Sequence, residues 1–394
     1  KNSTLTQNSN SQENDDYDTT NLATTFEWAP NDNLKFHMDV IINEQERSRD
    51  QYRLQASGVS SLRQLSIPTA FETVDFGVGP GRFPAALAGT LEPDLDNDDD
   101  DPNLRFSSET NSRVTDSDVF SIGGEWQNDR LTASFELSSS NSDTVSPNLS
   151  TTLNFINPNC PLDGSSNDNC VPFIYDLSGG TLSFGVNYDS PFAPDPSDLL
   201  DPANVVLDQV SVDRNTNENS EDALRIDFSY ELDWKSVSSV DFGYRYNESS
   251  SKFEDIGDRI GGFSKMVDSP NGSLFADLLV AGPSNFGDAD GRELAMRNFL
   301  IINPDMAFSN PDQVIDTLEA ALIAHDPTPD LLSLSPSASA FFNIAEETQA
   351  LYAQANFEFE NVVGNVGVRH IKTTVDSTGN TNIDGNDTLT TISG

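Results

Sequence analysis

The most regular feature of this chain is the alternation of apolar and polar residues in four segments. In each segment, apolar side chains such as Phe26 and Leu34 occupy every second position on both sides of a polar turn. A period of two is typical of a β-strand that has one apolar and one polar face. The pattern therefore predicts an all-β, antiparallel fold of about eight strands in four hairpins. These hairpins lie near residues 22–47, 117–142, 222–249 and 347–376.

The connections between these segments are uneven in length. Within a hairpin, a turn of about four to six residues rich in Asn, Asp, Ser and Gly is expected. Between hairpins the chain runs through about 70, 80 and 100 residues without comparable alternation. Short turns at one end and very long loops at the other are typical of outer-membrane β-barrels. In the longest connection, the segment DQVIDTLEAALIAH after Asn310 and Pro311 predicts one short amphipathic helix.

The two faces of the expected strands differ in charge. In the strand segments, the apolar positions contain no Asp, Glu, Lys or Arg, whereas the alternate positions carry thirteen such residues. A soluble β-sandwich also alternates, but a charge on a lipid-facing strand costs roughly 2–4 kcal/mol, so the strict absence favours lipid. The polar positions are then expected to face the lumen and the ligand. The candidates are Lys35, His37, Asp39, Arg225, Asp227 and Arg245.

All three tryptophans, Trp28, Trp126 and Trp234, stand at the apolar positions just before a hairpin turn, and Phe359 has the same place in the fourth hairpin. Amphipathic aromatic rings concentrate where a membrane meets water. The placement predicts an aromatic girdle at the short-turn border of a membrane, with ordinary core packing as the alternative.

Charge and composition exclude several functions. With 64 acidic and 21 basic residues, the formal net charge is −43, which argues against nucleic-acid binding. No apolar run of 18 residues is present, so no transmembrane helix is expected. Residues 1–20 are polar and do not resemble a signal peptide, so the chain either is cytosolic or begins after its targeting segment.

Two features of the connections suggest local chemistry. Cys160 and Cys170 lie ten positions apart in a loop-like stretch, which favours a disulfide over a metal pair. The alternating Asp94, Asp96, Asp98 and Asp100 look like a calcium loop. An EF-hand, however, needs Gly and Glu where Asp99 and Arg105 stand. A solvated acidic loop and a weak Ca²⁺ site both stay open.

No arrangement of His, Cys or Ser predicts catalysis or a zinc site, so no enzyme activity and no cofactor are expected beyond that possible structural Ca²⁺. If the loops bind ligand, their aromatic residues are candidates for stacking on sugar rings. These residues are Phe76, Phe83, Phe173 and Tyr175.

Several motifs resemble the barrel region of TonB-dependent outer-membrane receptors, particularly the proteobacterial group that takes up carbohydrates and other nutrients. They are FEWAPNDNLKFHMDV, EETQALYAQANFEF and VVGNVGVRHIKTTV, and they cover a quarter to a third of the chain. The resemblance implies a cell outer membrane location, contact with outer-membrane lipid, and active import of a scarce small-molecule nutrient such as an oligosaccharide or a chelated metal. It also implies energy supplied by the TonB complex through a plug domain.

The chain departs from that family because residues 1–394 contain nothing like the plug and end in DTLTTISG rather than in a strand with a terminal aromatic. We therefore expect an internal fragment of a larger barrel, with a complete eight-stranded barrel as the alternative. A secreted, calcium-ordered all-β binding or adhesion protein is the alternative from another functional class. A hydrolase is the third.

Overall fold

The structure is a computed structural model that describes most of the chain. The described residues are 8–57, 66–75, 82–93, 103–160, 170–179, 182–261, 266–286, 288, 296, 298–337, 340–359, 362–383 and 386–393.

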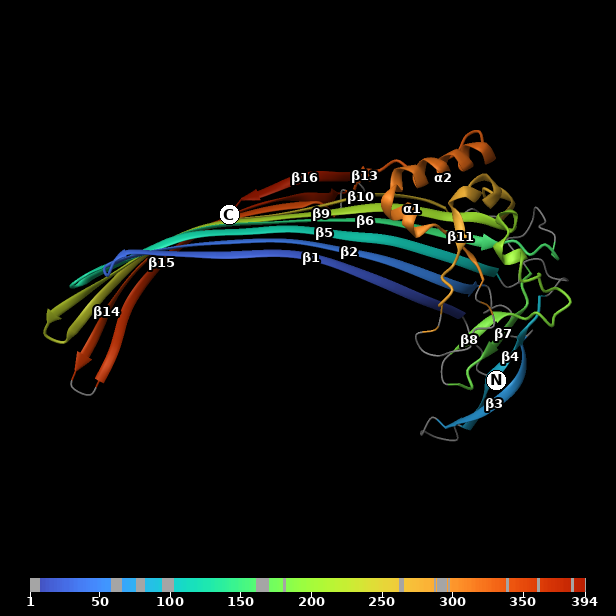
Figure 1. The fold of residues 1–394 in the computed structure, drawn as a ribbon, viewed down its shortest axis with the longest axis horizontal. Coiled ribbons are helices and arrows are strands. Elements are labelled where there is room, and N and C mark those ends of the chain that lie inside the picture. Colours follow the sequence, from blue (N-terminus) through green and yellow to red (C-terminus); the bar gives the residue numbers. More distant parts are fainter. Residues whose placement is uncertain are drawn as a thin grey trace.

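One large antiparallel sheet dominates the molecule (Figure 1). Its strands lie in the order β1-β2-β5-β6-β9-β10-β14-β15-β16, and the two-residue β13 also pairs with β10. The expectation of an all-β, antiparallel fold is confirmed. Among the described residues the sheet is open, with β1 at one edge. The strand bounds are β1 Asn8–Asn31, β2 Leu34–Ser57, β5 Asn103–Asn128, β6 Leu131–Phe155, β9 Val205–Trp234, β10 Val237–Gly261, β13 Ser335–Pro336, β14 Phe342–Phe359, β15 Val362–Ile383 and β16 Asn386–Ser393.

Smaller elements gather at the end of the sheet that is remote from the hairpin turns (Figure 1). They form a four-stranded sheet in the order β3-β4-β7-β8, a two-stranded sheet of β11 and β12, and two α-helices. Their bounds are β3 Ser66–Asp75, β4 Arg82–Leu91, β7 Phe173–Asp176, β8 Ser183–Val186, β11 Leu279–Ala281, β12 Leu300–Ile302, α1 Pro304–Ser309 and α2 Pro311–His325. Five single-turn 3-10 helices lie at η2 Asp198–Leu200, η3 Pro202–Asn204, η4 Met266–Asp268, η5 Gly272–Leu274 and η6 Ala276–Leu278.

The hairpin turns are tighter than the four to six residues expected from the sequence. In the first three hairpins only residues 32–33, 129–130 and 235–236 separate the paired strands. Asp129 and Lys235 adopt positive φ angles of 31° and 56°, the left-handed conformation that two-residue hairpins require.

The strands are much longer than the alternating segments, so the connections are shorter than the sequence indicates. The stretches between β2 and β5 and between β6 and β9 are residues 58–102 and 156–204. Beyond the apolar segments both strand faces are polar, as in SSSNSD at 138–143, so the period of two disappears although the pairing continues. This loss of contrast hid the outer halves of the strands.

Each long strand has one apolar and one polar face near the turns. We call the face that carries Trp28, Phe36, Trp126, Phe228 and Phe242 the apolar face, and the opposite side the polar face. Alternate residues of a strand point to opposite sides, so the hydrogen-bonded pairings fix which residues share a face.

At the end of the sheet remote from the turns, the apolar face is covered by the rest of the chain. Leu104 and Phe106 of β5 are buried, and the Phe106 ring lies 5.6 Å from that of Phe299, next to β12. Helix α1 contacts β5, and α2 buries a stripe that includes Val314 and Leu318. The stripe agrees with the helix expected from the sequence. Two expected sugar-stacking aromatics, however, are part of this core, because Phe173 and Tyr175 are buried.

Two ionisable residues of β2 lie in this covered region. Burial raises the pKa of Asp50, and a hydrogen bond with Thr110 partly offsets the rise. Burial also raises the pKa of Tyr52, whose side chain interacts with Asp50. Among the described residues, no helix combines the length and the apolar character needed to cross a bilayer.

Candidate functional site

The half of the apolar face nearest the hairpin turns is bare. Its large side chains lie open, and the four expected girdle residues are all exposed: Trp28 55%, Trp126 40%, Trp234 63% and Phe359 54%. All four lie at the turn end of their strands. Within the described part of the chain no second layer covers this apolar band. A soluble monomer rarely leaves so large a contiguous apolar surface open to water.

The turn-end aromatic residues are staggered relative to the hydrogen-bonded rows of the sheet. The row that starts at Trp28 crosses β5 at Gly124, two residues before Trp126. The same row crosses β9 at Ile226, eight residues before Trp234. It then crosses β14 at Leu351, eight residues before Phe359. The offset toward the turns is thus two residues after two strand steps and eight residues after both four and six steps, so the line of aromatics slopes in one direction overall but not evenly.

This stagger gives the angle between the aromatic line and the hydrogen-bonded rows, which equals the tilt of the strands from the perpendicular to that line. With ~3.3 Å per residue and ~4.8 Å between strands, eight residues over six steps correspond to about 40°. The far border of the apolar band slopes in the same direction, from Leu22 on β1, six residues beyond the Trp28 row, to Leu351 within that row. Measured perpendicular to the aromatic line, the band from Leu224 to Trp234 on β9 is roughly 25 Å tall.

A row of acidic residues crosses the apolar face beyond the band, two residues from Ile42 on β2 and six residues from Leu224 on β9. Glu44, Asp116, Asp143 and Glu218 occupy one hydrogen-bonded row on four adjacent strands of the apolar face. Only the last of them has a basic neighbour in the row, Lys252, at 3.2 Å. The apolar face is therefore polar and acidic on the side of the band remote from the turns.

The polar face carries a charged cluster around Asp227. Arg225 Nε and Arg245 NH1 donate to its two carboxylate oxygens at 2.6 and 2.9 Å, and the Tyr352 hydroxyl donates at 2.7 Å. Arg225 and Arg245 stand directly opposite each other, so Asp227 separates two like charges. Gly243 leaves the space for this approach, since a Cβ there would collide with Asp227 and Tyr352.

The other expected lumen residues form a separate group on β2. Lys35 pairs with Glu27 at 3.2 Å, and the His37 ring occupies the space above Gly123. Asp39 accepts hydrogen bonds from hydroxyl groups of β1 and β5 at 2.7 and 3.2 Å. Lys35 shares a row with Asp227 but lies three strands away, about 14 Å. The six candidates thus share one face and form two groups rather than one site.

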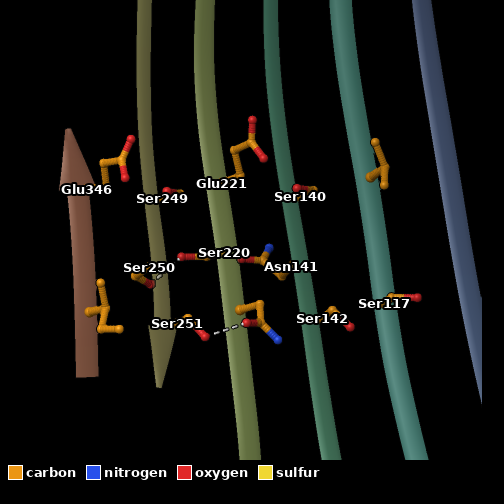
Figure 2. Close-up of a pocket in the computed structure, with 13 residues that line it drawn as sticks. Ser117, Ser140, Asn141, Ser142, Ser220, Glu221, Ser249, Ser250, Ser251 and Glu346 are labelled. Atoms are coloured by element: carbon orange, nitrogen blue, oxygen red, sulfur yellow. Dashed lines mark hydrogen bonds between the residues drawn. The ribbon is translucent and has the colours of Figure 1, made fainter. Parts of the chain in front are cut away.

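The polar face also has a recess of about 430 Å³ that crosses β5, β6, β9, β10 and β14 (Figure 2). Its lining is mostly Ser and Asn, with two carboxylates, Glu221 and Glu346. Sequence reasoning missed this recess because short polar residues in a strand carry no recognisable motif. It also missed Tyr352, whose place on the polar side of a strand otherwise rich in Ala and Gln was the available signal.

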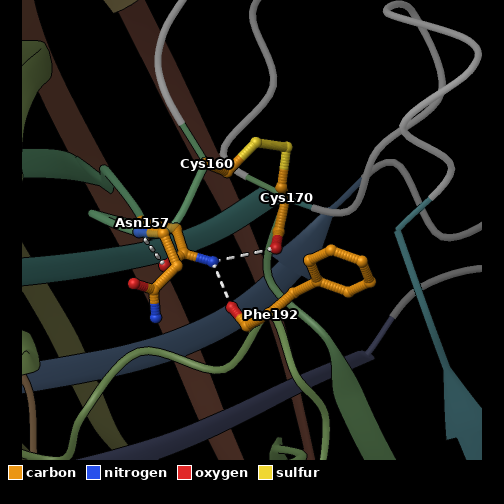
Figure 3. Close-up of a disulfide and its surroundings, with 5 residues drawn as sticks. Asn157, Cys160, Cys170 and Phe192 are labelled. Atoms are coloured by element: carbon orange, nitrogen blue, oxygen red, sulfur yellow. Dashed lines mark hydrogen bonds between the residues drawn. A yellow bond between two sulfur atoms is a disulfide. The ribbon is translucent and has the colours of Figure 1, made fainter.

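Cys160 and Cys170 are joined by a disulfide, with Cα atoms 5.9 Å apart (Figure 3). The buried Asn157 side chain donates to the backbone oxygens of Cys170 and Phe192 at 3.0 and 2.8 Å, which ties the loop to the core. Asp94, Asp96, Asp98 and Asp100 lie outside the described residues, as do Phe76 and the side chain of Phe83. Within the described residues, no three His, Cys, Asp or Glu side chains are grouped to hold a metal ion.

Known proteins show little similarity to this chain. No family model matches the sequence. No curated protein is similar to it at a significant level. Among solved structures, the chain has a weak likeness to BauA, the ferric preacinetobactin receptor from Acinetobacter baumannii, with 10% identity and a TM-score of 0.29. The likeness covers 98% of this chain and 43% of that receptor. A TM-score this low does not establish a shared fold or a shared function.

Proposed function

We propose that this chain is part of an outer-membrane β-barrel that imports a scarce small-molecule nutrient. The observation that carries the proposal is the bare apolar band, whose two borders slope in the same direction, the aromatic border at about 40° to the hydrogen-bonded rows. Strands of transmembrane barrels tilt by 35–45°, and their outward apolar band is about 25 Å tall between aromatic girdles. A horizontal membrane border drawn across tilted strands produces this stagger. A soluble core has no reason to align Trp28, Trp126, Trp234 and Phe359 on such a line.

The free edges of the sheet show what else the proposal requires. Strand β1 pairs with β2 on one side, and no described strand pairs with its other side. At the opposite edge, β16 pairs only with the far part of β15, from Asp376 to Ile383. In hydrocarbon each unpaired backbone group costs several kcal/mol, so open sheet edges do not occur there. We therefore propose that these edges are paired in the membrane, by further strands of the barrel or, in the isolated chain, by the matching edges of other copies. In the assembled receptor a plug inside the lumen would contact the TonB complex, as the resemblance of the barrel motifs implies.

Import rather than catalysis fits the polar face. Arg225, Asp227 and Arg245 satisfy one another and leave no activated nucleophile. The outer halves of the strands extend well beyond the membrane band and carry the covered end described above. In the proposed orientation, that end faces the outside and meets the nutrient first. The secreted adhesion protein would instead need a second layer over the band, and nothing described supplies one.

Insertion into a bilayer tests the proposal. The urea-unfolded chain is diluted into vesicles of short-chain phosphatidylcholine and, separately, into buffer, and the vesicles are floated on a sucrose gradient. We expect the chain to float with the vesicles, to gain β-sheet circular dichroism only there, and to migrate differently on gels with and without boiling. A chain that folds in buffer and stays at the bottom of the gradient would contradict the proposal.

A further inference from the structure

Two rows of polar-face residues that cross β9, β10 and β14 line the recess, and a third polar-face row lies beside it. The first row holds Glu221, Ser249 and Glu346. The second holds Asn219, Ser251 and Ile344, and the third Asn217, Phe253 and Phe342. On β6, Ser140 and Ser142 pair with the first two rows. The recess starts three residues beyond the far border of the apolar band, since Glu221 precedes Leu224 on β9.

Neutral donors and acceptors dominate this surface. Asn219 Oδ1 accepts from the Ser251 hydroxyl at 2.8 Å, which orients the amide across the floor of the recess (Figure 2). The Glu221 carboxylate accepts from Asn247 at 2.5 Å and that of Glu346 from Thr348 at 3.3 Å. Each carboxylate uses one oxygen in these bonds and has its second oxygen available to a ligand hydroxyl. The serine hydroxyls can both donate and accept.

The charge of the recess restricts the ligand. No Lys or Arg lines it, although the chain contains 21 of them. The nearest basic residue along the strand, Lys252, belongs to the opposite face and pairs there with Glu218 at 3.2 Å. Two carboxylates without a cation repel an anionic ligand and favour one that offers hydrogen-bond donors.

An aromatic pair borders the recess on its third row. The Phe253 and Phe342 rings are stacked, with centroids 5.6 Å apart and planes 18° apart, and Phe342 is 38% exposed. Both rings are on the polar face, next to Ser251 and Ile344. Open aromatic rings beside hydroxyl and amide groups suit a ligand that has one apolar C–H face and many hydroxyls.

We propose that this recess binds a short, neutral oligosaccharide, with hydroxyls on Asn219, Glu221, Glu346 and the serines and a ring face on Phe342. Its volume of about 430 Å³ lies within the range of small-molecule sites. Binding requires only the polar face of the sheet. That the recess binds its ligand during import rests on the proposed function.

The test is isothermal titration calorimetry of the folded full chain in a detergent without a sugar headgroup. The probes are maltotriose, cellotriose and xylotriose, with trigalacturonic acid as an anionic trisaccharide. We expect at least one neutral probe to bind with a Kd below about 10 mM, and the acidic probe to bind at least tenfold more weakly. Absence of binding by all three neutral probes, or equal binding of the acid, would overturn the proposal.

Variants locate the binding. Ser140→Trp fills the recess and should abolish binding, whereas Ser139→Trp places the same bulk on the opposite face and should leave it unchanged. Phe342→Ala should weaken binding about tenfold, the scale of one aromatic contact. The double variant Glu221→Gln and Glu346→Gln should weaken binding of the neutral sugar and reduce the difference in affinity between the neutral and the acidic trisaccharides. Equal effects of the two Trp variants would contradict the placement of the sugar in the recess.

The two proposals fail separately in these experiments. Sugar binding by a chain that does not float with vesicles would contradict the membrane function and leave the recess in place. Insertion into vesicles without sugar binding would contradict the sugar site and leave the membrane function in place. Circular dichroism of each variant in the same detergent shows whether lost binding reflects lost folding.

Discussion

Phe242 is the most informative position at which to place a charge. It lies on β10 at the middle of the apolar band, five residues after Val237 and four before Tyr246. Its side chain is 43% exposed and stacks on Phe228 with ring centroids 5.0 Å apart. Substitution by Arg therefore places a guanidinium where we propose hydrocarbon, without removing a buried core residue.

The expected loss of stability differs in size between the two environments. Loss of the aromatic pair costs about 1 kcal/mol in either environment. In a bilayer, Arg near the midplane costs a further 2–4 kcal/mol or so. In water, Arg on a half-exposed site has no such cost and removes exposed apolar surface. Phe242→Leu loses only the aromatic pair, so the difference between the Arg and Leu variants isolates the lipid contribution.

The assay is urea unfolding in phosphatidylcholine vesicles, followed by circular dichroism and by the boiled and unboiled gel mobilities. Ser138→Arg is the matched control, because it adds the same charge on the polar face of β6. We expect Phe242→Arg to lower the free energy of unfolding by at least 2 kcal/mol more than Phe242→Leu, and Ser138→Arg to change it little. Equal stability of Phe242→Arg and Phe242→Leu would refute the assignment of the band to lipid.

Three further predictions concern other parts of the chain. Asp227→Asn removes the carboxylate between two opposed guanidinium groups and should lower stability by about 2–3 kcal/mol in urea unfolding, while Asn21→Asp on the polar face of β1 should not. Reduction of the Cys160–Cys170 disulfide should cost about 3 kcal/mol in thermal unfolding of the covered end and leave the vesicle-bound sheet spectrum unchanged. Burial raises the pKa of Asp50, so its favourable contribution is present below its ordinary pKa of 3.8 and is lost as the pH rises through the raised value. Asp50→Asn should therefore raise Tm at pH 7 and have little effect at pH 3. The pKa of Asp15 is lowered by hydrogen bonds from Arg49 and Arg47, so Asp15→Asn should lower Tm at pH 7. A rise in Tm for Asp15→Asn, or a fall for Asp50→Asn, would contradict the corresponding assignment.

The sequence predicted the part of the fold where water and hydrocarbon would impose different residues on the two faces. Phe26, Trp28 and Leu34 against Glu27 and Lys35 give a contrast that locates the strands and their shared apolar side. The helix after Pro311 was predictable for the same reason, because its apolar stripe recurs with the helical period.

Other parts could not be predicted because their physical signal is weak. Residues 138–143 are polar on both faces, so nothing in their composition distinguishes a strand from a loop. The recess on the polar face depends on the register of five strands, and a sequence of Ser and Asn does not contain that register. The strands β7, β8, β11 and β12 were missed because strands of three or four residues, such as Phe173–Asp176, are too short to show a period.

Depth-dependent quenching of tryptophan fluorescence by brominated lipids tests the central claim most directly. Three variants keep one tryptophan each, Trp28, Trp126 or Trp234, with Phe at the other two positions, and a fourth carries Phe359→Trp alone. Folded in vesicles whose lipids carry bromine at different depths, all four should be quenched most strongly at one common depth near the headgroups. Indoles that escape quenching, or that lie at clearly different depths, would contradict a membrane border along this line.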